Sequence, residues 1–200
     1  MDYTKLPGSA TAYRRQKQIE DCLFENLLQR PYPSVSISDL CHQLDISRKS
    51  FYNYFPDKDS CLRSFISRKL HTCVLMLTAD VPKDASLEEM ISCYLSYWKQ
   101  EENLLSIIVR NNLVQMLMDQ CIHFLQAENQ IILPHLNTPH LKADSFVLSA
   151  FVSIQVTLIL QWYLKNFEPP LEEMVHTYNR LIYQPLLLLD EIPLNGKDTL

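Results

Sequence analysis

The sequence predicts an all-α protein of about nine helices. Apolar residues recur at helical spacing through most of the chain, and prolines interrupt this pattern at intervals. No segment alternates convincingly in the manner of a strand. The only two glycines, Gly8 and Gly196, lie near the termini. Because helix interiors disfavour glycine, a core without glycine agrees with an all-helical fold.

Each helix is expected between a proline or polar stop and the next one. The expected ranges are 13–29, 36–44, 48–55, 58–80, 86–100, 103–110, 112–133, 143–167 and 171–190. Pro31 and Pro33 end the first helix, and Pro134 precedes a loop at 135–140. The segment from Val81 to Asp84 is the clearest boundary in the chain.

The second and third helices are short and are joined by the three residues 45–47. Ser36 followed by Asp39 resembles a capping box, and Ser47 is placed to cap the third helix. Asp45 is among the residue types that enter left-handed backbone conformations with some ease. We expect apolar packing to lock the two helices at a fixed angle through Leu40, Leu44, Ile46 and Phe51. This is the spacing of a helix-turn-helix, whose second helix fits a DNA major groove.

The charge distribution agrees with nucleic-acid binding by the first part of the chain. The net charge is −5, but residues 1–70 carry 11 Lys and Arg against 8 Asp and Glu. Residues 71–200 carry 7 Lys and Arg against 15 Asp and Glu. A basic head on an acidic body fits a small DNA-binding domain carried by a part that need not touch DNA.

Composition excludes several other classes. A phosphate-binding glycine loop has no glycines inside the fold to build it. The six cysteines form no C-x-x-C pair and are expected to be buried thiols, and His135 and His140 have no nearby carboxylate for a metal site. We expect no cofactor. No uninterrupted run of eighteen apolar residues and no signal-peptide core occur, which favours a soluble cytoplasmic protein without membrane contact.

Residues 46–59, Ile-Ser-Arg-Lys-Ser-Phe-Tyr-Asn-Tyr-Phe-Pro-Asp-Lys-Asp, resemble the recognition-helix signature of TetR/AcrR-family transcriptional regulators. That signature runs from a hydrophobe and Ser through an apolar–Tyr pair and Tyr or His–Phe to Lys and an acid. The resemblance covers residues 13 to 62 at most. It departs at Asp45, where the family often has Gly, and at Lys49, where the family has Gly or a small residue.

The resemblance implies a DNA-binding surface on the two short helices. Arg48 is expected to contact guanine, Tyr52 a thymine methyl or a phosphate, and Tyr54 and Lys58 phosphates. Phe51 and Phe55 are expected in the core. The full predicted set is Ser36, Ser38, Ser47, Arg48, Lys49, Ser50, Tyr52, Asn53, Tyr54 and Lys58.

The resemblance also divides the chain into a helix-turn-helix domain at 1–57, a connecting helix at 58–80 and an effector-binding and dimerisation domain at 81–200. For an unknown small-molecule effector we expect Tyr94, Trp98, Met116, Gln120, His123 and Phe124. Apolar residues on nearly every face of 144–167 predict a homodimer, through Phe151, Ile154, Leu158, Trp162, Tyr178, Leu181 and Ile182. Plain core packing is the alternative interpretation of both sets.

The expected function is a repressor that leaves a palindromic operator when it binds its effector. Sequence does not decide between a repressor and an activator. A TetR-like protein that has lost DNA binding and acts as a co-activator or partner of another regulator is the main alternative. A helical enzyme using Cys121 and His123 is disfavoured, since side chains two positions apart on a helix diverge by about 200°.

Overall fold

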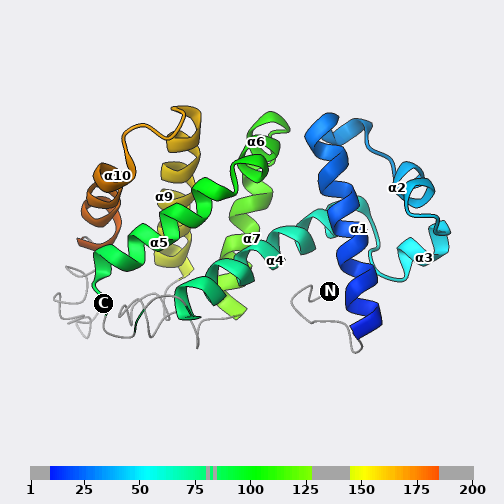
Figure 1. Ribbon diagram of the computed structural model, residues 1–200, viewed down its shortest axis with the longest axis horizontal. Coiled ribbons are helices and arrows are strands. Elements are labelled where there is room, and N and C mark those ends of the chain that lie inside the picture. Colours follow the sequence, from blue (N-terminus) through cyan, green and yellow to red (C-terminus); the bar gives the residue numbers. More distant parts are fainter. Residues whose placement is uncertain (1–9, 80–81, 83–84, 128–144, 185–200) are drawn as a thin grey trace, which may run out of the picture. The chain divides into compact units, whose positions relative to one another are not determined.

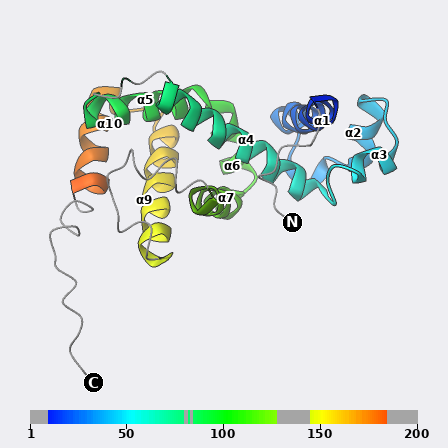
Figure 2. The same cartoon turned by 90° about the horizontal axis from the view of Figure 1, so that it is seen from below.

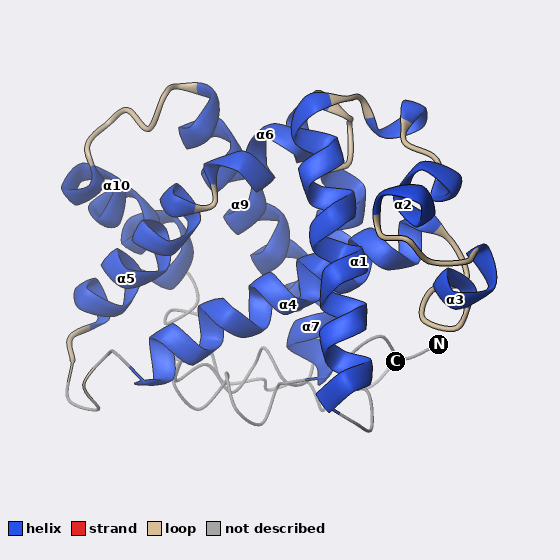
Figure 3. Cartoon of the chain, turned by 45° about the vertical axis from the view of Figure 1, so that its right-hand side comes forward, coloured by secondary structure: helices blue, strands red, loops and turns tan. Residues whose placement is uncertain are grey.

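The computed structural model of the chain describes residues 10–79, 82, 85–127 and 145–184. These residues form helices and connecting loops, without a strand among them, which confirms the all-α prediction (Figure 3). The elements are α1 (Ala10–Gln29), η1 (Tyr32–Ser34), α2 (Ile37–Gln43), α3 (Arg48–Tyr52), α4 (Lys58–Ala79), α5 (Leu87–Gln100), α6 (Glu102–Arg110), α7 (Val114–Ala127), α9 (Ser145–Leu164), α10 (Leu171–Tyr178) and η3 (Asn179–Tyr183).

Most predicted helix ranges agree with these elements. Two local features were not expected: the 3-10 turn η1 inside the proline segment, and the π-helical turn η3 that continues α10. Proline at the start of η1 fixes a backbone angle that suits the first turn of a helix. The predicted loop 135–140 and the predicted helix residues 128–133 and 185–190 lie outside the described residues.

The helices group into two compact units (Figures 1 and 2). The first unit contains residues up to Leu75 together with Glu101–Ala127, so that α6 and α7 pack with α1 to α4. The second contains Met76–Gln100 and the described residues from Ser145 onward. The predicted boundaries at 57/58 and 80/81 stay a prediction, because packing and function need not divide a chain at the same residues.

Local capping defines α2 and α3 as the sequence predicted. The Ser36 hydroxyl accepts a hydrogen bond from the Asp39 amide at 3.1 Å, and Asp39 Oδ2 accepts one from the Ser36 amide at 3.2 Å. The Ser47 hydroxyl accepts from the Ser50 amide at 3.0 Å. Asp45 has a φ of 48°, which is the left-handed conformation that the short turn requires. The two helices therefore begin at defined residues and are separated by one tight turn.

The core of the helix-turn-helix region, α1 to α3, lies under α2 and α3. Leu40 and Phe51 are fully buried, and Phe55 follows at 1% exposure. Leu44 and Ile46 are half-buried. The buried face of α1 consists of Ile19, Cys22, Leu23 and Leu27. The expectation that Phe51 and Phe55 are core residues is confirmed.

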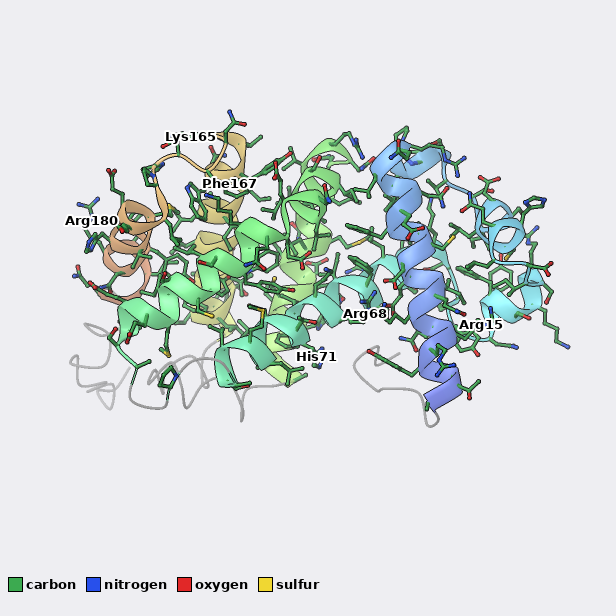
Figure 4. All side chains as sticks on the ribbon, in the orientation of Figure 1. Arg15, Arg68, His71, Lys165, Phe167 and Arg180 are labelled. Carbon is green, nitrogen blue, oxygen red and sulfur yellow. The ribbon has the colours of Figure 1, made fainter. Side chains whose placement is uncertain are left out.

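A buried ion pair connects α1 to α4, and helical patterning does not predict it. Glu20 is only 2% exposed, and its carboxylate accepts hydrogen bonds from Arg68 Nε at 2.7 Å and from the Ser64 hydroxyl at 2.7 Å. Figure 4 labels Arg68 where α4 passes α1. Arg68 also donates to Asp21 at 2.5 Å. Removing one partner of a buried pair leaves an uncompensated charge, so this pair holds α1 and α4 in one arrangement.

Lys58, predicted as a phosphate contact, binds two backbone carbonyls within the fold. Its ammonium donates to the carbonyls of Tyr32 at 2.6 Å and of Val35 at 2.8 Å, and it lies 4.1 Å from the centre of the Tyr32 ring. Burial lowers the pKa of Lys58. Two of its three N–H donors are thus used inside the protein, and the side chain anchors η1 to the start of α4.

The capping box makes stability depend on pH. Hydrogen bonds from the Ser36 amide and hydroxyl lower the pKa of Asp39. A carboxyl with a lowered folded-state pKa stabilises the fold above its unfolded pKa of about 3.9, and that contribution disappears as the pH falls through the folded value. We expect Asp39→Asn to be less stable than the wild type at neutral pH and the difference to shrink below about pH 4. Urea unfolding across pH measures this, and a difference that does not vary with pH would contradict it.

Replacing Lys58 tests its anchoring role. We expect Lys58→Met to lower the free energy of unfolding by about 1–3 kcal/mol, because the carbonyls of Tyr32 and Val35 lose their donor. The control is Lys49→Met, which changes an exposed lysine of α3 and should alter stability by less than about 0.5 kcal/mol. Chemical denaturation of both variants gives the comparison. Equal stability of the two would show that Lys58 does not anchor η1.

Candidate nucleic-acid interface

The outer face of α3 carries the residues predicted to bind DNA. Arg48, Lys49, Tyr52 and Asn53 are exposed, while Ser50 and Tyr54 are half-buried. Tyr52 is 45% exposed, although its neighbour Phe51 is fully buried. No acidic residue lies in the first turn of α3. The helix therefore presents two cations, one aromatic hydroxyl and one amide to solvent from a single short element.

Arg48 and Tyr52 lie one helical turn apart and interact directly. Arg48 Nη2 donates to the Tyr52 hydroxyl at 3.3 Å, and the guanidinium carbon lies 6.0 Å from the ring centre. The hydrogen bond to Tyr52 raises the pKa of Arg48. The Tyr52 ring packs edge-on against Phe51, with ring centres 5.7 Å apart. The buried Phe51 thus supports Tyr52, and Tyr52 in turn orients the guanidinium of Arg48 along α3.

The serines of this region have different uses. The Ser36 and Ser47 hydroxyl oxygens accept the capping hydrogen bonds of α2 and α3, and the Ser47 and Ser50 hydroxyls lie 3.0 Å apart. Ser38 is exposed on the first turn of α2. Ser36 and Ser47 thus fix the starts of the two helices, and Ser38 is an exposed residue of α2.

A side-chain network holds α2 against α1. The amides of Asn26 and Gln43 exchange two hydrogen bonds, of 2.7 and 3.2 Å. Arg30 donates to Asn26 Oδ1 at 2.5 Å and lies 3.5 Å from the Asp39 carboxylate. Asn26 is 9% exposed, so the network is partly shielded from water. It fixes the first helix of the pair, whose position determines that of α3.

The residues predicted for an effector fall into the two different units. Tyr94 and Trp98 lie in the second unit, whereas Met116, Gln120, His123 and Phe124 lie in the first. His123 is exposed. Trp98 and Gln120 are 3% and 5% exposed, and Trp98 Nε1 and Gln120 Oε1 have no hydrogen-bond partner among the described residues. Tyr94 donates from its hydroxyl to Gln155 Oε1 at 2.8 Å.

Four of the residues predicted to form a dimer interface are in the core of the second unit. Phe151, Trp162, Tyr178 and Ile182 are each at most 4% exposed, and Trp162 Nε1 donates to the Pro169 carbonyl at 2.7 Å. They are buried within the single chain, and their place in a dimer interface stays a prediction. Leu158 is half-buried, while Ile154 and Leu181 are 42% and 44% exposed.

The exposed side of α9 forms one continuous stripe. Its members share a single helix face by their spacing of three or four residues, and they are Phe146, Ala150, Ile154, Thr157, Gln161 and Leu164. Phe146 and Leu164 are 84% and 53% exposed. The helix contains no charged residue. A sequence apolar on all sides could not distinguish this face from the buried one.

By length and hydropathy, Phe146–Leu164 also meets the requirements of a membrane span, with a mean hydropathy of 1.7. Ser149, Ser153, Gln155, Thr157 and Gln161 interrupt the apolar sequence of this helix, so it contains no uninterrupted apolar run of eighteen residues. In the folded chain 39% of this window is buried. The exposed stripe includes Thr157 and Gln161, which suits a protein interface at least as well as lipid.

Among the described residues, no group of three His, Cys, Asp or Glu is placed to hold a metal ion. All six cysteines are thiols, and burial raises the pKa of Cys121 to about 12. A thiol with so high a pKa is protonated at neutral pH and is a poor nucleophile. The cationic face of α3 is therefore the candidate functional site among the described residues.

Residues 24–65 match the model of the family described as bacterial regulatory proteins, tetR family. The HTH-type transcriptional regulator EthR of Mycobacterium tuberculosis is 38% identical over 69 residues. That match covers 33% of this chain and 32% of EthR, so the chain spans about a third of the length of this relative.

Solved structures of regulators share the fold over most of the chain. A putative TetR-family regulator of Syntrophomonas wolfei has a TM-score of 0.58 at 17% identity, covering 92% of this chain and 98% of its own. A tetR-family regulator of Streptomyces coelicolor has a TM-score of 0.58 at 19% identity, covering 88% and 81%. FadR of Bacillus subtilis in complex with stearoyl-CoA has a TM-score of 0.56 at 17% identity, covering 82% of this chain and 96% of its own. The helix-turn-helix segment of this chain therefore matches the tetR family model at residues 24–65, and the chain shares its all-helical fold with solved TetR-family regulators.

Proposed function

We propose that the protein is a DNA-binding transcriptional repressor, which binds a palindromic operator as a homodimer and leaves it when a small molecule binds. The observation that carries the proposal is the exposed face of α3, where Arg48, Lys49, Tyr52 and Asn53 project from a helix fixed by caps at its start and by Phe51 beneath it. A helix held in this way fits a major groove.

The chemistry of this face supports base reading by Arg48. A guanidinium donates two parallel hydrogen bonds to guanine O6 and N7, and such a contact discriminates by about 1–3 kcal/mol. Tyr52 holds the guanidinium before DNA arrives, which reduces the entropy lost on binding. Lys49 and Asn53 are exposed beside it and suit phosphate or base contacts. Ser38 and Tyr54 complete the proposed surface.

The proposed palindromic operator follows from a two-fold homodimer formed through α9. The exposed stripe on this helix is about 27 Å long and is uncharged. In a two-fold interface the same stripe meets itself, which removes the side chains of Ile154 and Leu164 from water in both subunits. Leu181, on η3, contributes a further exposed apolar side chain in the same unit. A two-fold dimer places two copies of α3 on two half-sites about 34–36 Å apart.

Binding of a small molecule is supported by two buried polar atoms that have no partner. The Trp98 indole N–H is a donor in the second unit, and Gln120 Oε1 is an acceptor in the first. Each such group costs about 1–3 kcal/mol when it stays unpaired, and a polar atom of a ligand removes that cost. The neighbour FadR was solved with stearoyl-CoA. The protein then leaves DNA if the ligand favours a conformation in which the helix-turn-helix regions of the two subunits have a different spacing. We expect the protein to act in the cytoplasm.

DNA binding is tested by a retardation assay with duplexes selected by the wild-type protein from a random library. We expect affinity to fall steeply as salt rises, because phosphate contacts release counterions. Replacing Arg48 and Tyr52 together by Ala should weaken binding by at least about tenfold. Arg180→Ala is the control, since this exposed cation lies in the second unit. Full binding by the Arg48/Tyr52 variant would exclude the α3 surface, and no duplex binding by the wild type would favour a regulator that acts through another protein.

The dimer is tested by adding charge to the exposed stripe. We expect the double variant Ile154→Glu, Leu164→Glu to sediment as a monomer where the wild type sediments as a dimer, because an interface would have to bury four unpaired carboxylates. Tyr13→Glu places the same charge on a 37% exposed residue of α1 and should leave the dimer intact. A dimer that persists in the double variant would exclude the α9 stripe as its interface.

A further inference from the structure

The short segment from Arg30 to Val35, which connects α1 to α2, is a meeting point of three helix ends. The C-terminal ends of α1 and α6 lie beside each other in both views (Figures 1 and 3), and the start of α4 is bonded to the same segment. All of these residues belong to the first compact unit. The segment ends one residue before Ser36, which caps α2. Its position therefore determines where the helix-turn-helix begins.

Arg110, in the last turn of α6, binds the end of α1. Its Nη2 donates to the Leu27 carbonyl and lies 3.4 Å from the Leu28 carbonyl. These carbonyls belong to the last turn of a helix, where the helix itself supplies no donor. The guanidinium also lies at the negative end of the α1 dipole, which strengthens the contact. Arg110 is thus a C-terminal cap of α1 supplied from 83 residues further along the chain.

Asn111 follows Arg110 and binds η1. Its Oδ1 accepts a hydrogen bond from the Tyr32 amide at 2.7 Å, and its Nδ2 donates to the Ile107 carbonyl of its own helix at 2.9 Å. The second bond fixes the side chain on α6, so that the first bond transmits the position of α6 to η1. Asn112 then turns the chain away with a φ of 55°.

Tyr32 connects η1 to the start of α4. Its carbonyl accepts from Lys58, its ring lies under the Lys58 ammonium, and its hydroxyl donates to Asp59. Val35, whose carbonyl Lys58 also binds, is 1% exposed. A displacement of the α6 end must therefore either break these bonds or move the segment that starts α2.

We propose that Arg110 and Asn111 are positioning residues for DNA binding, which set the orientation of α2 and α3 through η1. The inference rests on the proposed function and adds its regulation: α6 is coupled to the reading helices by a direct route, separate from the contacts that α6 and α7 make with α4. Those other contacts include the Lys69–Glu101 pair at 2.7 Å, the Arg63–Asp119 pair at 3.8 Å and the edge-on packing of His71 against Phe124.

The test uses four variants of the full chain. Asn111→Ala removes the acceptor for the Tyr32 amide, whereas Asn111→Asp retains an acceptor for that amide, adds a negative charge and loses the hydrogen bond to the Ile107 carbonyl. The control is Gln115→Ala, which removes an exposed amide of α7 bonded to Asp119 on its own helix. Arg110→Gln removes the α1 cap independently and serves if Asn111→Ala does not fold.

We expect Asn111→Ala to bind the duplexes selected by the wild type about three- to tenfold more weakly, with a smaller loss on random duplex, so that the specificity ratio falls. Asn111→Asp should recover part of the affinity, because it restores the acceptor for the Tyr32 amide but not the bond to Ile107, and Gln115→Ala should match the wild type. Hydrogen exchange at the Tyr32 amide should accelerate in Asn111→Ala and slow again in Asn111→Asp. A merely stabilising contact would shift thermal unfolding without changing this ratio.

The proposal is overturned if Asn111→Ala, or Arg110→Gln in its place, keeps the wild-type affinity and specificity ratio. It is also overturned if Asn111→Asp binds no better than Asn111→Ala while both are folded. These outcomes require a wild-type protein that binds the selected duplexes. A wild type that binds no duplex would instead contradict the proposed function itself.

Discussion

A helix of five residues has no stability of its own, and the DNA-facing side of α3 depends on the burial of Phe51 beneath it. One face of α3 is anchored in the core through this ring, and the Ser47 cap fixes its first turn. The opposite face is thereby held towards solvent. The buried Phe51 ring positions Tyr52 by edge-on packing. Tyr52 in turn accepts a hydrogen bond from Arg48 and so orients its guanidinium.

The parts of this site that local chemistry determines could be predicted from the sequence. Ser36 and Ser47 are caps because of their types and their places before apolar helical patterns, and Asp45 takes the left-handed turn that only a few residue types accept easily. The alternation of buried Phe51 and exposed Tyr52 follows from helical spacing. Each of these features involves residues within four positions of one another.

The contacts between distant residues were not predictable in the same way. Nothing near Lys58 in the sequence shows that its ammonium binds carbonyls 23 and 26 positions earlier, and the family signature suggested a phosphate instead. Arg110 and Glu20 are ordinary charged residues in the sequence and become anchors only when the helices pack. Helix α9 shows a related limit. Because it is apolar on every side, periodicity did not separate buried Phe151 from exposed Ile154.

The central claim is that α3 reads guanine in a major groove. Methylation interference with dimethyl sulfate on a duplex selected by the protein tests it most directly, because the methyl group at guanine N7 lies in the major groove and that at adenine N3 in the minor groove. The account predicts interference at guanine N7 in each of two half-sites centred about 10 base pairs, or a multiple of this, apart. Interference confined to adenine N3, or binding unaffected by methylation at any guanine, would contradict it.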